Sequence, residues 1–300
     1  MSDTGFAALA AARWIHFASV MLLFGASLFT FYALPAQTIS PEPRRARGVL
    51  RVAALLAFVS GLAWAAASLV NITGEIDSLS DRETLAAFLF DTGFGKVWAL
   101  RLLLLMATLL VAFIAGAGLC ARNFATALIA LLTALLLISQ AWIGHPAAST
   151  GGERNAIILG YALHVLGAGA WLGGLLPLWL IVRVRNAHDR SIDIALRRFS
   201  AVGMFAIAII LVGGLINLWA RWNSLDALLA SAWGKVLVAK LLGFIALVTI
   251  AIVNRFVLMP RLPMQGSPRA RLMCNVLAEQ AGGLAILAAA AILGILPPPA

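Results

Sequence analysis

Long apolar runs, separated by short polar connections, follow one another along the whole chain. Eight runs are long enough to cross a bilayer, because a hydrocarbon core of about 30 Å needs about 20 helical residues. They cover roughly residues 8–33, 50–71, 96–118, 123–143, 156–182, 200–220, 234–258 and 274–296. No strand-like alternation is visible, and a helix satisfies its own backbone hydrogen bonds in lipid. The pattern predicts an all-α integral membrane protein with eight transmembrane helices in one polytopic domain, residues 1–300.

Composition supports this class of protein. Hydrophobic residues make up 62% of the chain and charged residues 11%, whereas soluble domains are about half apolar and about a quarter charged. The net charge of +10 does not indicate a nucleic-acid partner, because no basic block is interleaved with aromatic residues. No phosphate-binding loop or nucleophile elbow is present. ATP-driven pumping is therefore not expected, and enzymatic activity stays open.

The basic residues between the runs alternate in density and predict the topology. Arginines concentrate in four connections and at the helix ends beside them: Arg44, Arg45, Arg47 and Arg51; Arg122; Arg183, Arg185, Arg190, Arg197 and Arg198; Arg255, Arg261, Arg269 and Arg271. The other connections hold most of the acidic residues. By the positive-inside rule the arginine-rich connections are cytoplasmic, so both termini are expected on the outer side of the membrane.

The two halves of the chain resemble each other. Aligning "ARWIHFASVMLLFG" with "YALHVLGAGAWLGG" places His16 over His164, each with a glycine nine residues later. The third and seventh runs, "FGKVWALRLLLLMA" and "WGKVLVAKLLGFIA", share an aromatic-Gly-Lys-Val start and a second cation five residues on. We therefore expect two parallel four-helix repeats, residues 1–143 and 144–300, related by an axis along the membrane normal.

Three of the four histidines are candidate metal ligands at the outer face. His16 and His164 lie about 12 Å deep at 1.5 Å per residue, and the expected symmetry lets them face one another. His145 closes the fourth run at the outer mouth. Imidazole suits copper, and a thioether such as Met21 would assist Cu(I). The alternative is that each histidine donates a hydrogen bond to a carbonyl group.

A second interpretation of the same residues is a haem b site with bis-histidine ligation. Two histidines on facing helices can ligate iron axially, and nearby cations would hold the propionates. The residues of this site would be His16, His164, Lys96, Arg101, Lys235 and Lys240. Snorkelling to the interface is the simpler explanation for the two shallower lysines.

Glu279 is the one acidic residue inside a predicted span, near its cytoplasmic end. Ionisable groups inside a membrane are costly and mark pathways, so Glu279 is a candidate cytoplasmic-side relay for a proton or a departing cation. A structural alternative is an ion pair with Arg255.

Several motifs, taken in order, resemble the CopD family of bacterial copper-resistance membrane proteins. They are "RWIHFASVMLLFG", "DTGFGKVWALRLLL", "GHPAAS", "HVLGAGAWLGGLLPLW", "GKVLVAKLL" and "AEQAGG". The resemblance implies an eight-span inner-membrane protein of copper homeostasis that moves copper beside a periplasmic carrier of the CopC type. No carrier domain is recognisable in this sequence, so a separate partner is expected. The resemblance supports His16, His145 and His164 as copper ligands.

The sequence leaves three functions open: a copper transporter or acceptor, a haem-bearing redox protein, and an assembly factor for a copper enzyme. Against transport, the sequence shows no paired sulfur motif towards the cytoplasm. Its candidates there are scattered: Met106, Met204, Cys120 and Cys274.

Overall fold

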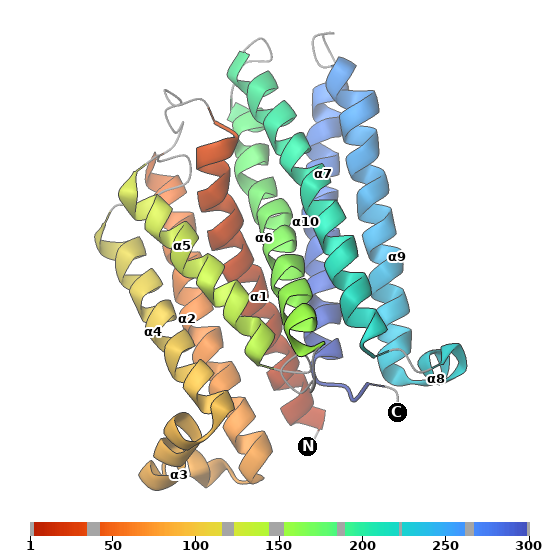
Figure 1. Ribbon diagram of the computed structural model, residues 1–300. Helices are drawn as coiled ribbons and strands as arrows, with labels where there is room; N and C mark the ends of the chain where they lie inside the picture. The colour runs from red at the N-terminus through yellow and green to blue at the C-terminus, as the bar shows by residue number, and fades with distance from the viewer. Residues whose placement is uncertain are drawn as a thin grey trace.

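A bundle of eight long helices makes up the protein (Figure 1). The computed structural model describes residues 3–34, 43–115, 123–143, 153–184, 190–221, 224–261 and 267–298, and these contain no strand. Within these ranges eight helices are long and apolar enough to cross a membrane, which confirms the predicted class. They are α1 (Asp3–Tyr32), α2 (Pro43–Thr73), α4 (Gly93–Ile114), α5 (Phe124–Ser139), α6 (Arg154–Val184), α7 (Arg190–Trp219), α9 (Ala232–Val253) and α10 (Ser267–Leu293).

Short helices add to the bundle at its two ends. Between α2 and α4 lie η1 (Ile76–Leu79), α3 (Arg82–Ala86) and the π-helical turn η2 (Ala87–Asp91), and between α7 and α9 lies α8 (Leu225–Ala230). The helices α3 and α8 and both chain termini lie at the same end of the bundle, which is named the terminal end (Figure 1). The opposite end is named the arginine-rich end. There α9 continues into a π-helical turn, η5 (Asn254–Leu258), and a 3₁₀ turn, η6 (Met259–Arg261); η3 (Gln140–Trp142) extends α5 at the terminal end.

Helices α1 and α6 run side by side through the centre of the bundle (Figure 1). They touch backbone to backbone, since a Cβ atom added to Gly25 would lie 2.2 Å from the Gly169 carbonyl oxygen and 2.6 Å from Gly173 Cα. Glycine permits this approach because it has no side chain, and close packing drives association between helices in lipid. Helices α5 and α10 each contact both central helices.

The starts of α4 and α9 are built alike. Thr92 caps α4 by accepting a hydrogen bond from Gly95 N at 2.8 Å, and Ser231 caps α9 by accepting one from Gly234 N at 2.9 Å. A Cβ atom on Gly95 would lie 1.6 Å from the Phe88 carbonyl oxygen, and one on Gly234 would lie 1.8 Å from a carbonyl oxygen of α8. Each start is thus a side-chain cap followed by a glycine against the preceding short helix.

Arginines at the arginine-rich end donate hydrogen bonds to the last carbonyl groups of neighbouring helices. Arg51 of α2 donates to the Ala112 and Phe113 carbonyl oxygens at the end of α4, at 3.3 and 3.2 Å. Arg269 of α10 donates through Nε to the Val182 carbonyl oxygen at the end of α6, at 3.0 Å. The last carbonyl groups of a helix lack partners within it, and a guanidinium group satisfies them.

Candidate metal site

His16 is fixed on both sides of its ring by neighbouring helices. Its side chain is 1% exposed. Nδ1 lies 3.0 Å from the Ala57 carbonyl oxygen of α2, and Nε2 lies 2.8 Å from an Arg101 terminal nitrogen of α4. Because a guanidinium group only donates, Nε2 must accept, and Nδ1 therefore carries the proton that it donates to Ala57. Neither ring nitrogen of His16 is free for a metal ion.

Arg101 joins three helices and is almost fully buried, at 1% exposed. Besides His16 it donates to the Leu136 carbonyl oxygen and to Ser139 Oγ of α5, both at 2.7 Å. Its guanidinium carbon also lies 5.6 Å and 5.2 Å from the ring centres of Trp64 and Trp98. Hydrogen bonds and cation–π contacts thus compensate for its burial.

His164 is held on one side only. Its Nδ1 lies 2.8 Å from the Ile210 carbonyl oxygen of α7, which fixes the proton on Nδ1. Within the part of the chain that the structure describes, Nε2 has no hydrogen-bond partner, and the residue is half-buried. Metal-binding histidines commonly donate one N–H to a carbonyl group in this way, which orients the ring and raises the basicity of the other nitrogen. Both His16 and His164 thus make the hydrogen bond to a carbonyl group that was the alternative to metal binding, and in the described chain only His164 keeps a ring nitrogen without a partner.

The backbone around the two rings is nevertheless alike. Each Nδ1 atom pairs with a carbonyl oxygen that precedes a glycine by four residues, Ala57 before Gly61 and Ile210 before Gly214. A Cβ atom on Gly61 would lie 3.3 Å from the His16 ring, and one on Gly214 would lie 3.5 Å from the His164 ring. These glycines, which the sequence did not mark as site residues, leave room for the imidazoles.

The structure does not bring His16 and His164 together, which corrects the expectation that they face one another. Nine residues are about 2.5 turns of an α-helix, so each histidine lies on the opposite face of its helix from the glycine that follows it. The faces with Gly25 and Gly173 form the contact between α1 and α6. His16 therefore points towards α2 and α4, and His164 towards α7.

One further predicted ligand, Met21, does not join His16 in the structure. Met21 lies on the side of α1 that contacts α6, with its Cγ 3.6 Å from where a Cβ atom of Gly169 would be. Five residues turn the helix through about 500°, so Met21 lies far around α1 from His16. His145 lies outside the described residues. Among the described residues, no group of three His, Cys, Asp or Glu side chains could hold a metal ion.

The four predicted cations separate into two pairs. Lys96 and Lys235 are exposed near the starts of α4 and α9. Arg101 is buried against His16, and Lys240 is half-buried and interacts electrostatically with His164. They do not form one cradle for a pair of propionates between two facing histidines.

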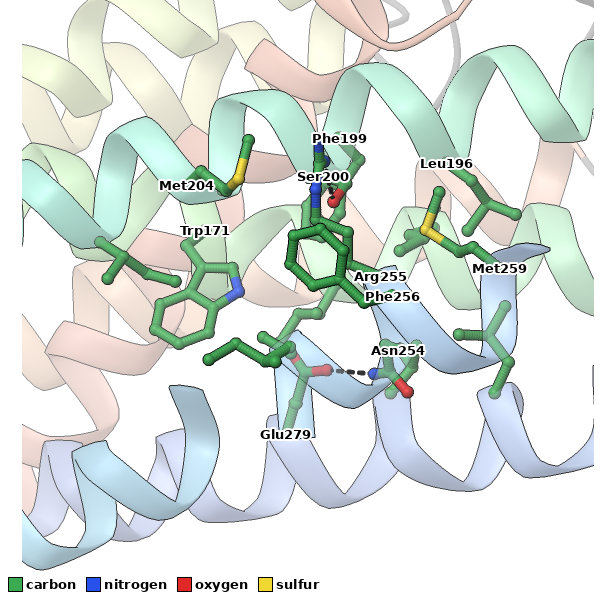
Figure 2. Close-up of a pocket in the computed structure, with 18 residues that line it drawn as sticks. Trp171, Leu196, Phe199, Ser200, Met204, Asn254, Arg255, Phe256, Met259 and Glu279 are labelled. Atoms are coloured by element: carbon green, nitrogen blue, oxygen red, sulfur yellow. Dashed lines mark hydrogen bonds between the residues drawn. The ribbon is translucent and has the colours of Figure 1, made fainter. Parts of the chain in front are cut away.

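Glu279 of α10 is 3% exposed and pairs with an amide rather than with a cation. Asn254 Nδ2 donates to Glu279 Oε1 at 2.5 Å, as Figure 2 shows. The Arg255 guanidinium group instead donates to Ser200 Oγ at 2.6 Å, so the expected Glu279–Arg255 ion pair is wrong. Asn254 lies in the π-helical turn η5, which helical periodicity in the sequence did not reveal.

Comparison with known proteins decides the family. Residues 1–156 match the family model for the N-terminal domain of copper resistance protein D-like proteins, and residues 193–293 match the model for copper resistance protein D. The chain belongs to the copper resistance protein D family. No solved structure matches it.

Two relatives align with this chain over more than four fifths of their own length, and a third over a smaller part. Inner membrane protein YebZ of Escherichia coli is 31% identical over 255 residues, which are 84% of each chain. Copper resistance protein D of Pseudomonas syringae pv. tomato is 28% identical over 262 residues, 83% of this chain and 82% of that one. Copper transport protein CutJ of Bacillus subtilis is 30% identical over 222 residues, 73% of this chain and 39% of that one. The resemblance seen in the sequence is thus confirmed, and the eight spans agree with a multi-pass inner-membrane protein.

Proposed function

We propose that this protein accepts copper at His164 on the periplasmic side of the inner membrane and moves it towards the cytoplasm. The single observation that carries the proposal is the half-satisfied ring of His164, whose Nδ1 is bound to Ile210 while Nε2 has no partner in the described chain. Imidazole nitrogen is a common copper ligand. The names of the relatives from P. syringae and B. subtilis refer to copper, which supports the choice of metal.

Lys240 supports a site that binds and releases its ion. Lys240 interacts electrostatically with the His164 ring. A positive charge beside the ring weakens the hold on a copper ion. A transport site must bind well enough to load and weakly enough to unload. His145 is the proposed additional ligand, and a periplasmic carrier of the CopC type is the proposed donor.

We infer that residues 1–143 and 144–300 are two related halves that move against each other. The matched caps of α4 and α9 and the matched carbonyl and glycine contacts of His16 and His164 support this inference. Transporters built from repeats change access by rocking one half against the other. The α1–α6 glycine contact lies between the halves and is the natural pivot. His16, clamped by Arg101, then has a structural role in the first half.

The alternative functions gain less from the geometry. A bis-histidine haem needs two imidazoles on one cavity, and His16 and His164 point towards different helices. An assembly factor for a copper enzyme needs a surface for its client, and no described feature favours one. Copper handling remains the function with specific structural support.

Metal titration of the purified protein in lipid nanodiscs tests the proposal. We expect His164→Ala to lower affinity for Cu(I) at this site at least tenfold, which is about 1.4 kcal/mol. His188→Ala, a change at the histidine of the polar run "RVRNAHDR", is the matched control and should bind as wild type. A ¹⁵N-histidine spectrum should show the His164 Nε2 signal shifting on metal addition while the His16 signals stay in place. Unchanged binding by His164→Ala would sink the proposal, and a Soret band in the wild-type protein would favour the haem alternative.

Transport is tested separately in proteoliposomes. We expect copper uptake by wild type and by His188→Ala, and a loss of uptake by His164→Ala at low copper concentration. Equal uptake by the two variants would separate binding at His164 from movement across the membrane and would refute its part in transport.

A further inference from the structure

A pocket of about 110 Å³ opens near the arginine-rich end, between α6, α7, η5 and α10 (Figure 2). Most of its lining is apolar, including Trp171 and Phe199. Ser200 and Asn254 contribute polar groups, and Glu279 of α10 borders the space. A space of this size with polar partners in its wall can hold water molecules. The carboxyl group of Glu279 therefore lies beside a compartment whose water can exchange a proton with it.

The carboxyl group of Glu279 is bound by neutral side chains, and the residue is 3% exposed. Asn254 Nδ2 donates to Oε1 at 2.5 Å. Asn254 Oδ1 accepts from Asn275 Nδ2 at 2.7 Å, which fixes the orientation of the Asn254 amide. The Trp171 side chain also interacts with the carboxyl group. Amide and indole N–H groups carry no net charge, so these contacts supply no counter-charge.

Arg255 of η5 is the charged residue that lines the described pocket besides Glu279, and it is engaged elsewhere. Its guanidinium group donates to Ser200 Oγ of α7 at 2.6 Å. Figure 2 shows the Arg255 side chain near Ser200 and the Glu279 carboxyl group at Asn254, with the Phe256 ring between them in this view. No ion pair joins the two described residues Arg255 and Glu279.

The other elements packed against α10 bring no further charge into the described lining. The lining residues of α6, α7, α9 and η6 are not ionisable. From α1, Tyr32 lies beside Gly174 of α6 and outside the lining. Cys274 of α10 itself is exposed. Glu279 is thus an acidic residue buried among neutral groups, whereas the other acidic residues of the described chain are exposed.

An unpaired carboxylate is costly in this surrounding, because burial removes its hydration and no cation replaces the lost water. A bound proton removes the charge and leaves the packing as it is. Because Oε1 accepts from Asn254, Oε2 is the oxygen that carries the proton. We propose that Glu279 is a proton-binding site, which holds a proton in the packing that the structure shows and releases it to water in the pocket.

The π-helical turn η5 gives the site a way to respond to the loss of its proton. α9 is regular up to Val253, and Asn254 begins η5. Such turns within α-helices occur frequently at functional sites. When the O–H bond of Glu279 breaks, the proton passes to a water molecule and a carboxylate stays behind, which then needs hydration. A shift of η5 that widens the pocket supplies that hydration.

The link between this site and transport rests on the proposed function. Copper that moves from His164 towards the arginine-rich end adds positive charge to this half of the bundle, which favours release of the Glu279 proton. The proton is bound again once the ion has left. The inference thus adds a proton-coupled step to the proposed function.

Infrared spectroscopy of the full-length protein, in a detergent without ester groups, tests the proton site in the absence of copper. A protonated carboxyl group has a carbonyl stretching band that carboxylates lack. We expect wild type to show this band at neutral pH and to lose it as the pH rises. Glu279→Gln should lack the band, whereas Glu153→Gln, the same change at an exposed residue, should keep it. Gln keeps the size of the side chain and an oxygen acceptor for Asn254, so the fold should survive the exchange.

A wild-type protein without this band at neutral pH would overturn the inference, and that measurement needs no variant. A band that persists in Glu279→Gln would overturn it as well, because the proton would then belong to another group.

Proteoliposomes with an entrapped pH-sensitive dye test the link to transport. We expect copper uptake by wild type and by Glu153→Gln to be accompanied by a change in internal pH, and Glu279→Gln to lose that change. A proton signal that Glu279→Gln retains would refute the coupling. Absence of copper uptake by wild type would refute the proposed function instead and would leave the infrared band unaffected, so the two failures are distinguishable.

Discussion

His16 and His164 differ in the hydrogen-bond partner of their Nε2 atoms. His16 and His164 both give their Nδ1 proton to a carbonyl oxygen, but only His16 meets a guanidinium group at the other nitrogen. The lone pair of His16 is thereby used within the protein, whereas that of His164 has no partner among the described residues. The sequence did not distinguish the two histidines, because Arg101 and Lys240 stand at matching positions of two similar motifs. The two side chains nevertheless differ in length and in hydrogen-bonding geometry.

Arg101 is expected to be essential for stability. Arg101→Met leaves His16 Nε2 buried without a donor, whereas Ser139 Oγ still donates to the Leu136 carbonyl oxygen at 2.9 Å. An unsatisfied buried group costs about 1–3 kcal/mol, so we expect a loss of about that size in thermal or denaturant unfolding in detergent. Arg197→Met is the control, since Arg197 pairs with Asp193 at the surface, where an ion pair contributes less than about 1 kcal/mol. Equal effects of the two variants would contradict the role given to Arg101.

Asp81 is expected to make the start of α3 sensitive to acid. The Thr84 hydroxyl and the Thr84 and Glu83 N–H groups donate to its carboxylate and hold its pKa below the usual value for aspartate. A lowered pKa stabilises the folded state above the unfolded pKa, and this stabilisation is lost as the pH falls through the folded pKa. Amide exchange in α3 should therefore accelerate in acid below the ordinary aspartate range. Asp81→Asn keeps a capping oxygen and should remove the pH dependence; an unchanged acid transition would assign it to another group.

At the scale of elements, hydrophobic patterning predicted the spans well and their relative rotation poorly. The predicted first span, residues 8–33, overlaps α1 (Asp3–Tyr32), and all eight spans have counterparts. The short helices α3 and α8 were missed because they are shorter than any span. The rotation of α1 was missed because nine residues, which look like one motif in the sequence, place His16 and Gly25 half a turn apart. The face of α1 that packs against α6 is determined by Gly169 and Gly173, which are distant from α1 in the sequence.

Because α1 and α6 touch backbone to backbone, we expect a single methyl group added at Gly25 to lower the stability of the protein. In Gly25→Ala the new Cβ atom would lie 2.2 Å from the Gly169 carbonyl oxygen, and backbone on both sides prevents a local adjustment. Overpacking of this kind costs about 1–3 kcal/mol, and we expect a lower melting temperature in detergent. Gly48→Ala in α2 is the matched control, since nothing lies within 4 Å of its Cβ position, and it should gain up to about 1 kcal/mol. A Gly25→Ala protein as stable as wild type would mean that the central helices separate easily.

At the scale of the whole molecule, His164 and Glu279 lie at different depths. His164 lies towards the terminal end on α6, and Glu279 borders an apolar pocket that lies towards the arginine-rich end between α6, α7 and α10. The sequence pointed to His164 and Glu279 as separate residues, but Trp171, Asn254 and Met259 were not recognised as their neighbours. Their proximity depends on how four helices pack, which the apolar pattern of each helix leaves undetermined.

The direction of transport depends on the orientation of the whole bundle, which reporter fusions can measure. Both termini lie at one end (Figure 1), and arginines at the opposite end include Arg51, Arg183 and Arg269. Because basic residues are retained on the cytoplasmic side, we expect alkaline phosphatase fused after residue 300 to be active and green fluorescent protein fused there to be dark. Fusions truncated within residues 185–189 are the control and should give the opposite pair of signals. A fluorescent fusion after residue 300 would show the reverse orientation, with His164 towards the cytoplasmic side, and would contradict uptake from the periplasm.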